Sequence, residues 1–186
     1  MSERRTLIVL VGPTHSGKST VAKALVDEGY LHVSARTVLA SLAGVRNPTR
    51  KDLLATGAET ERTTRGRWLR DAVDTKAKRR SRIVVDSART RAQLDGLVNF
   101  AGDHGFELKV LFLTATVAER RRRFQRARKA KESRGFETTG WADLASQKLE
   151  STTISLRALA DLVVDTTKLS KRAVRRTMRT ICDDVA

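Results

Sequence analysis

Residues 7–20, LIVLVGPTHSGKST, join a run of apolar residues to a glycine-rich loop and then to a helical pattern. The loop fits the pattern G-x-x-x-x-G-K-[ST], with glycines at 12 and 17, a lysine at 18 and a serine at 19. A glycine-rich turn between a strand and a helix points backbone N–H groups inward, and the helix N-terminus adds partial positive charge. The stretch therefore predicts a phosphate-binding loop, and it requires a strand–loop–helix unit at the start of the fold.

Each part of this loop has an expected role in holding a nucleotide. Lys18 is expected to reach the β- and γ-phosphates, and the Ser19 hydroxyl is expected to coordinate Mg²⁺. The predicted cofactors are therefore ATP and Mg²⁺. The predicted nucleotide site is the whole loop: Gly12, Pro13, Thr14, His15, Ser16, Gly17, Lys18, Ser19 and Thr20.

Short apolar runs alternate with helical patterns along the rest of the chain. Strands are expected at Thr6–Val11, Leu31–Val33, Ile83–Val85, Leu108–Leu113 and Leu162–Val164. Helices are expected at Lys18–Asp27, Thr49–Thr60, Thr63–Arg80, Arg91–His104, Val117–Ala130, Trp141–Leu159 and Ser170–Cys182. Strands separated by helices are typical of βαβ units. We therefore expect an α/β fold of three layers, with a mainly parallel five-stranded sheet and one long helical insertion at Ala35–Lys78.

The chain is strongly basic. Its 186 residues carry 37 lysines and arginines against 21 acidic residues, for a formal net charge of +16, and 26 of the basic residues are arginines. Guanidinium groups bind phosphate in a planar bidentate fork, so the bias suits polyanionic ligands and leaves nucleic acid as a candidate partner. The base composition of the gene is an equally good explanation of the excess.

The cysteine count and the hydropathy bear on the compartment. Cys182 is the only cysteine, so the chain cannot form an internal disulfide bond, and a reducing compartment is expected. The apolar stretch before the loop is too short for a signal-peptide core, and no run of apolar residues is long enough to span a membrane. A cytoplasmic protein that does not bind membranes is expected.

A second group of charged residues follows the strand expected at Ile83–Val85, in RIVVDSARTR. Carboxyl ends of parallel strands face the same crevice, so Asp86 is expected to lie across from Ser19 and to hold Mg²⁺ or its waters. Arg89, with Arg91 behind it, could grip substrate phosphate. The alternative is that Asp86 caps the next helix and that the arginines are solvated.

These motifs, in their order, resemble the P-loop nucleoside monophosphate kinase group, and within it the dephospho-coenzyme A kinase-like branch. The resemblance covers nearly the whole chain. Its segments are GPTHSGKST, GYLHVSA, RKDLLATGAETERTTRGRWL, VVDSARTR, AERRRRFQRARKAKESRG and ADLVVDTT. The loop motif is specific for phosphate binding. The other segments support the resemblance mainly because they occur in the same order as in the family.

The resemblance implies a division of the single domain, 1–186, into three parts. The core would comprise about 1–34, 81–127 and 143–186, the acceptor-binding helical insertion about 35–80, and a short arginine-rich lid about 128–142.

In this group lid arginines close over the transferring phosphoryl group and exclude water. Arg120 and Arg123, three residues apart on one helix face, are the preferred lid residues, with Arg128 and Arg134 behind them. Val117 and Phe124 are expected to pack on the core. The predicted catalytic set is Lys18, Asp86, Arg89, Arg120 and Arg123.

The acceptor side departs from the family pattern. Where nucleotide kinases carry an aspartate and a phosphate-gripping arginine after the second strand, this chain has Thr37 and Ala40, and Ser87 replaces a usual glycine. The candidates to replace the lost grip are Arg36, Arg46, Arg50 and Arg62. The predicted acceptor-binding residues are Ser34, Arg36, Arg50, Arg62 and Arg89.

Three functions remain open from the sequence. The first is an ATP-dependent phosphotransferase that acts on a nucleotide or nucleotide-like acceptor. The second is a nucleic-acid kinase that phosphorylates a 5′-hydroxyl, which the charge favours but the missing acidic residue at Thr37 disfavours. The third is a nucleotide-dependent nucleic-acid binder that is not a kinase. The basic face of the C-terminal helix, which carries Arg172, Arg175, Arg176 and Arg179, either binds nucleic acid or is solvated.

Overall fold

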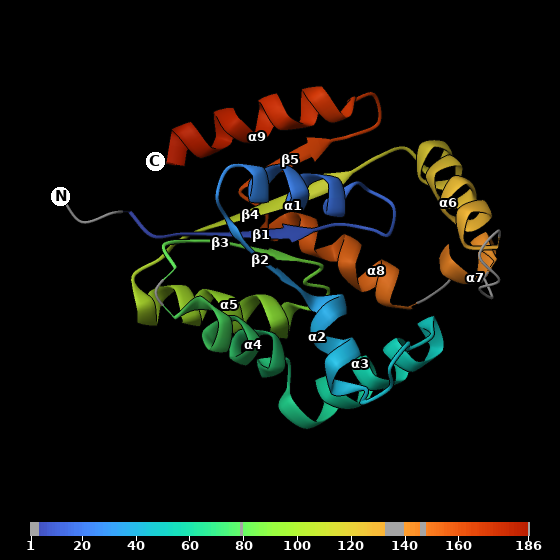
Figure 1. Ribbon diagram of the computed structural model, residues 1–186, viewed down its shortest axis with the longest axis horizontal. Helices are drawn as coiled ribbons and strands as arrows, with labels where there is room; N and C mark the ends of the chain where they lie inside the picture. Colours follow the sequence, from blue (N-terminus) through green and yellow to red (C-terminus); the bar gives the residue numbers. More distant parts are fainter. Residues whose placement is uncertain (1–3, 79, 133–139, 146–147, 186) are drawn as a thin grey trace.

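The computed structural model describes residues 4–78, 80–132, 140–145 and 148–185. One sheet forms the centre, and all its pairings are parallel, in the order β2-β3-β1-β4-β5 (Figure 1). Helices cover both faces, so the expected three-layer α/β fold with a five-stranded parallel sheet is confirmed. The strands are β1 Thr6–Val11, β2 Leu31–Ser34, β3 Arg82–Asp86, β4 Glu107–Thr114 and β5 Leu162–Asp165.

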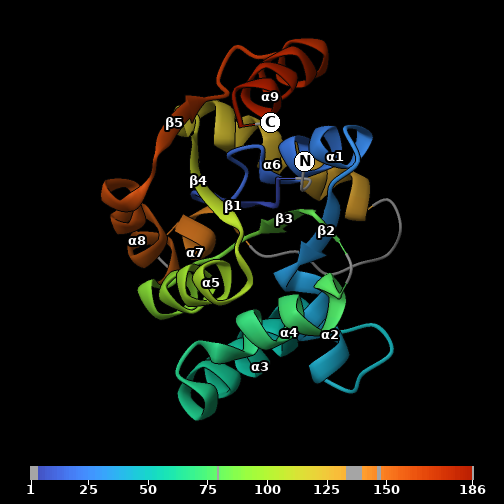
Figure 2. The same cartoon turned by 90° about the vertical axis from the view of Figure 1, so that its left-hand side faces the viewer.

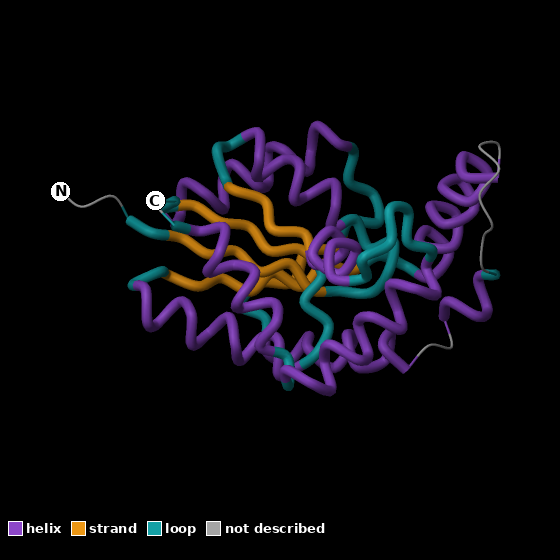
Figure 3. Tube along the Cα trace, turned by 60° about the horizontal axis from the view of Figure 1, so that its bottom comes forward, coloured by secondary structure: helices purple, strands orange, loops and turns teal. Residues whose placement is uncertain are grey.

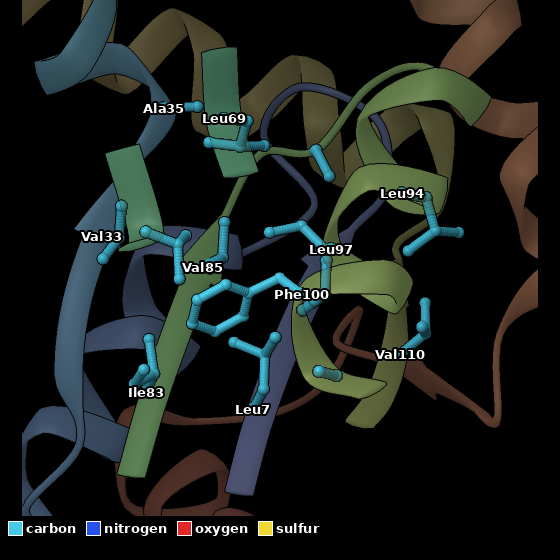
Figure 4. Packing of buried hydrophobic residues seen from close by; sticks show 14 of the residues in the cluster. Leu7, Val33, Ala35, Leu69, Ile83, Val85, Leu94, Leu97, Phe100 and Val110 are labelled. Atoms are coloured by element: carbon cyan, nitrogen blue, oxygen red, sulfur yellow. The ribbon is translucent and has the colours of Figure 1, made fainter. Parts of the chain in front are cut away.

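The central strand β1 is buried along its whole length because side chains alternate between two covered faces. Leu7 and Val9 face the layer formed mainly by α4 (Arg67–Ala77) and α5 (Arg91–His104). The Phe100 ring of α5 is fully buried in this layer, against Leu7 and the β3 side chains (Figure 4).

The opposite face of the sheet is covered by α1 (Lys18–Asp27) and α9 (Lys171–Val185), which pack side by side (Figure 2). Ile8 and Leu10 of β1 point into this second core, together with Leu25 of α1 and Met178 of α9. Both faces of β1 are therefore covered. At its carboxyl end the chain passes into the phosphate loop.

The helical insertion after β2 consists of α2 (Ala35–Leu42), α3 (Arg50–Thr64) and α4. The insertion is not helical throughout, because a loop separates α2 from α3, and the boundary expected between Thr60 and Thr63 lies instead at Arg65–Gly66. Arg65 and Gly66 both have positive φ, 51° and 81°. A Cβ on Gly66 would lie 2.8 Å from Ala92, so glycine lets the start of α4 approach α5.

The segment after β4 also differs from the prediction. The helix α6 covers Val117–Glu132. Where a single helix is expected at Trp141–Leu159, the described residues form α7 (Trp141–Ala145) and α8 (Lys148–Ser155), residues 146–147 lie outside the described ranges, and the last four residues form the 3-10 turn η1 (Leu156–Leu159). Arg134 and the rest of residues 133–139, about half of the expected lid at 128–142, lie outside the described residues.

Three apolar residues of the predicted helices and strands are exposed. Val117, at the first turn of α6, is 64% exposed, so only Phe124 of the expected pair packs inward. Leu162 and Val163 of β5 are about two-fifths exposed, at 42% and 40%, because β5 is an edge strand of the sheet. An apolar run of three residues does not distinguish an edge strand from a central one.

Candidate active site

The loops at the carboxyl ends of the strands gather at one end of the sheet, and the phosphate loop after β1 lies among them (Figure 3). Gly12 opens this loop with φ +136°, and a Cβ there would lie 2.1 Å from the carbonyl oxygen of Leu113 in β4. No other residue type fits so close to the neighbouring strand. The glycine thus brings the loop against the sheet.

Lys18 begins α1, and its side chain folds back into the loop. Its Nζ donates to the carbonyl oxygens of Gly12 at 2.7 Å and Pro13 at 2.8 Å. Burial, and after it the charge of Arg89, lower the pKa of Lys18 to about 7, while Glu150 and Asp86 act in the opposite direction. A polyphosphate would favour the charged ammonium and compete with the two carbonyls for it.

His15 occupies the middle of the loop in a left-handed conformation, with φ 63°. Its ring meets Phe124 of α6 edge-on, with 5.6 Å between ring centroids. Burial, followed by the charges of Lys18 and Arg50, lowers the pKa of His15 to about 4. The imidazole is therefore neutral at pH 7.

The remaining loop residues have different surroundings. The Ser16 hydroxyl is buried and has no hydrogen-bond partner among the described residues, while its carbonyl accepts from Thr166 Oγ1 at 2.7 Å. Ser19 and Thr20 are exposed in the first turn of α1. A phosphate oxygen would supply an acceptor for the orphaned Ser16 hydroxyl.

Asp86 ends β3, where it pairs in register with Leu10 of β1 and Ser34 of β2. It is buried, and its Oδ2 lies 3.2 Å from His32 Nε2. Its other oxygen, Oδ1, is buried and finds no hydrogen-bond partner within the described ranges. A buried carboxylate oxygen of this kind suits a Mg²⁺ ion or its water, so the donor set of Ser19 and Asp86 fits the predicted metal.

Arg89 follows Asp86 in a strained connection, since Ser87 has φ 69°. The Arg89 backbone N–H donates to Gln93 Oε1 at 2.8 Å, and its Nη1 lies 3.8 Å from Glu150 Oε1. Burial lowers the pKa of Arg89, and the charges of Glu150 and Asp86 oppose that effect. Arg91, by contrast, is exposed and pairs with Asp95 on its own helix.

Arg120 and Arg123 of α6 both reach the phosphate loop, as their spacing predicts. Arg120 Nε donates to the carbonyl oxygen of Thr14 at 2.9 Å, and Arg123 Nη1 donates to that of His15 at 3.3 Å. Arg123 also donates to Thr166, through Nη1 to Oγ1 at 2.9 Å and through Nη2 to the carbonyl at 2.7 Å. Arg128, further along α6, is exposed and pairs with Glu132.

The expected acceptor-binding residues do not all join the site. Arg50, at the start of α3, feels the charges of Arg89, Glu150 and Arg36, and burial lowers its pKa. Ser34 caps α2, accepting from the Thr37 N–H at 3.5 Å. Arg62 is instead exposed on α3 and pairs with Glu59 at 2.7 Å. The charges of two other expected acceptor arginines, Arg89 and Arg36, thus act on Arg50.

Two acidic residues near these arginines, Glu150, which is buried, and Glu61, which is partly buried, could not be found from the sequence pattern. Glu150 of α8 contacts Thr14, Arg120 and Arg89, and it is 3% exposed. Glu61 of α3 accepts from three side chains on α4 and α5 or just before α5: Trp68, Thr90 and Gln93. The sequence offers one signal for Glu150, which is the only acidic residue between Asp143 and Asp161.

The sheet order, the loop after β1 and the helical insertion define the class of the protein as a P-loop protein with a kinase-like fold. The sequence profile of AAA_33, an AAA domain family, matches residues 7–142, and the chain belongs to this family. No curated protein matches the chain.

Solved structures support the fold across the full length. An APS kinase of Mycobacterium tuberculosis, in complex with AMPPNP and APS, is 17% identical with a TM-score of 0.59, and the match covers 97% of this chain and 96% of that chain. A sugar kinase from Janibacter sp. HTCC2649 is 18% identical with a TM-score of 0.57, and the match covers 99% of each chain. A tunicamycin resistance protein of Deinococcus radiodurans is 16% identical with a TM-score of 0.60, covering 96% of each chain. The dephospho-coenzyme A kinase-like branch is not among these matches.

Within the described ranges, no helix has both the length and the apolar character needed to cross a bilayer.

Proposed function

We propose that the protein is an ATP-dependent phosphotransferase that moves the γ-phosphoryl group of ATP to a nucleotide or nucleotide-like acceptor. One observation carries the proposal: arginines from two different elements, Arg89 after β3 and Arg120 on α6, surround the phosphate loop with its buried Lys18. Phosphoryl transfer needs mainly positioning and charge neutralisation, and this arrangement offers both.

In the proposed reaction an acceptor oxygen attacks the γ-phosphorus, the bond to the β–γ bridging oxygen breaks, and ADP leaves. Lys18 neutralises charge on the β- and γ-phosphates, and the loop N–H groups orient them. Arg120, with Arg123 beside it, stabilises the transferring group, while Arg89 holds the acceptor. When bound at Ser19 and Asp86, Mg²⁺ would supply further neutralisation of phosphate charge.

The parts of the chain divide accordingly. We assign the core to about 1–34, 81–127 and 143–186, the acceptor-binding insertion to about 35–80, and the lid to about 128–142. Arg50 and Arg89 are the proposed acceptor grip, in place of the arginine that Ala40 replaces. The single cysteine, Cys182, favours the cytoplasm as the compartment.

The resemblance to the dephospho-coenzyme A kinase-like branch favours a nucleotide-like acceptor over a nucleic acid. The basic face of α9 is weak support for a nucleic-acid partner. Two of its arginines are paired with acidic residues, Arg175 with Asp27 and Arg179 with Glu28. Acidic neighbours reduce the attraction of such a face for polyanions.

The test is transfer from labelled ATP and Mg²⁺ to a panel of nucleoside monophosphates, dephospho-coenzyme A and 5′-hydroxyl oligonucleotides. We expect transfer to a small nucleotide-like acceptor, and we expect Lys18→Ala to abolish it while the variant stays folded. Transfer only to oligonucleotides would replace the proposed acceptor class. Tight nucleic-acid binding without transfer to any acceptor would overturn the proposal.

A further inference from the structure

Glu150 places a carboxylate directly on the phosphate loop. Both of its oxygens accept from the Thr14 backbone N–H, at 3.2 Å and 3.0 Å, and Oε1 also accepts from the Thr14 hydroxyl. Oε2 accepts from Arg120 Nη2 at 2.9 Å, and Arg89 Nη1 lies 3.8 Å from Oε1. The side chain is 3% exposed. The carboxylate comes from α8, more than a hundred residues away along the chain.

The donors around Glu150 are those that a phosphoryl group would use. Inward N–H groups of a glycine-rich loop bind phosphate oxygens, and arginines pair with phosphate and carboxylate in the same way. The Thr14 N–H already donates to both oxygens of the Glu150 carboxylate, and a phosphate oxygen brought to the same donor would meet the negative charge of that carboxylate. A phosphate oxygen that accepts from the Thr14 N–H therefore takes the place of Glu150.

The charges near the loop explain why an acidic residue is favourable there in the absence of a ligand. Lys18, Arg89 and Arg120 are all in or against the site, and the charge of Glu150 raises the pKa of each, against the effect of burial. Without Glu150, buried cations would face one another with no counter-charge from α8. Lys18 likewise donates to oxygens of the chain itself, the carbonyls of Gly12 and Pro13.

We propose that the Glu150 carboxylate occupies the position of a substrate phosphoryl group, and that a polyphosphate binding to the loop displaces it and loosens α8. Glu150 is thus an internal competitor for the anion site. The inference rests on the proposed function only in taking the loop as the polyphosphate site. It gives α8 a part in substrate binding that its sequence does not indicate.

The test uses inorganic tripolyphosphate and two measurements on the full chain. The first is the dissociation constant by calorimetry for the wild type, Glu150→Gln, and the control Glu119→Gln. Glu119 pairs with Arg122 and Arg123 on α6 and therefore reports the general effect of removing a nearby negative charge. We expect Glu150→Gln to bind about tenfold more tightly than wild type, and Glu119→Gln to change affinity by less than about threefold.

The second measurement is amide hydrogen exchange of residues 148–155 in the wild type. We expect tripolyphosphate to speed exchange in α8, because its carboxylate anchor is lost. Equal or weaker binding by Glu150→Gln would overturn the inference, and so would α8 exchange that is unchanged or slowed by the ligand. If Glu150→Gln does not fold, the wild-type exchange decides.

The same data separate this inference from the proposed function. A wild type that binds neither tripolyphosphate nor ATP overturns both. A wild type that binds tripolyphosphate and transfers phosphoryl groups, with α8 exchange unchanged, keeps the phosphotransferase and removes only the displacement of Glu150.

Discussion

Gln93 joins the backbone of Arg89 to Glu61. Its Oε1 accepts from the Arg89 N–H, and its Nε2 donates to Glu61 Oε2, both at 2.8 Å. Glu61 lies on α3, in the helical insertion, whereas Arg89 follows β3 in the core. The buried carboxamide thus links the proposed acceptor-binding insertion to an arginine that faces the phosphate loop.

Replacing Gln93 should affect acceptor binding more than ATP binding. Gln93→Met leaves the Arg89 N–H without a partner and removes one of the two donors to Glu61 Oε2, the other being Trp68 Nε1. The change should cost about 1–3 kcal/mol of the free energy of unfolding. The acceptor KM should rise several-fold, with a smaller change in the KM for ATP. Urea denaturation and steady-state kinetics with each substrate varied measure the two effects.

The control is Asn99→Met, an exposed amide on the same helix. It should leave stability and both KM values close to wild type. Equal increases in both KM values for Gln93→Met would show that the link supports the fold in general and does not position Arg89.

Nucleotide binding should take up protons at pH 8. The pKa of Lys18 is about 7 in the ligand-free site, so its amine is mostly neutral at pH 8. Bound phosphate stabilises the ammonium form and raises that pKa, so up to about one proton is taken from the buffer. Calorimetric binding enthalpies in buffers of different ionisation enthalpy give the number of protons.

The uptake should disappear at pH 6, where Lys18 is already protonated, and it should fall sharply in Lys18→Met at pH 8. A binding enthalpy that does not depend on the buffer at pH 8 would contradict the lowered pKa. His15, with a pKa of about 4, stays neutral at both pH values and does not contribute.

The stability of Lys18→Met should depend on pH in a defined direction. In the unfolded chain lysine keeps a pKa near 10.5, so between pH 7 and 10.5 the unfolded state binds more protons at this site than the folded state. The contribution of Lys18 to stability therefore rises with pH across this window, and its burial is most unfavourable below pH 7. Lys18→Met should be more stable than wild type at pH 7, with the difference shrinking toward pH 10. A difference that is constant with pH, by urea denaturation, would contradict this.

The strands and several helices could be predicted because their signals are local. The bounds of β1, α1 and α5 agree with prediction to the residue. For α5 the chain supplies both ends: Thr90 caps its start by accepting from the Gln93 N–H, and Gly105 ends it with φ 65°. The boundary expected between Thr60 and Thr63 lies a few residues later, at Arg65–Gly66, because glycine is tolerated within helical patterns and Gly66 alone did not mark a helix end.

The contacts of Glu150 could not be predicted from the sequence, for a physical reason. Its partner Thr14 lies 136 residues away, and the pairing depends on how α8 returns to the loop after α7. No periodicity or spacing near 150 indicates that return. Lys18 was predictable because glycine, lysine and serine act within one loop, where chain geometry alone sets their positions.

Single replacements of Arg120 and of Arg123 should have different effects on activity and stability, although both residues were predicted as lid residues. Arg123 directs its guanidinium to Glu119, the His15 carbonyl and Thr166, which ties α6 to the loop and to the end of β5. Arg120 contacts the loop and Glu150, the group that we propose a phosphate displaces. Arg120→Ala should lower kcat by about 100-fold or more with a smaller effect on ATP affinity, because it loses charge stabilisation of the transition state.

Arg123→Ala should lower the melting temperature as well as activity, since it removes the tie between α6 and β5. Thr166→Val separates these effects, because it removes the hydroxyl that contacts Arg123 and Ser16 while the arginine charge stays. We expect Thr166→Val to lower the melting temperature while keeping more of kcat than Arg123→Ala does. Equal losses of kcat in the two variants would mean that Arg123 acts only by anchoring α6. An unchanged kcat in the Arg120→Ala, Arg123→Ala double variant would remove both residues from the proposed transition-state site.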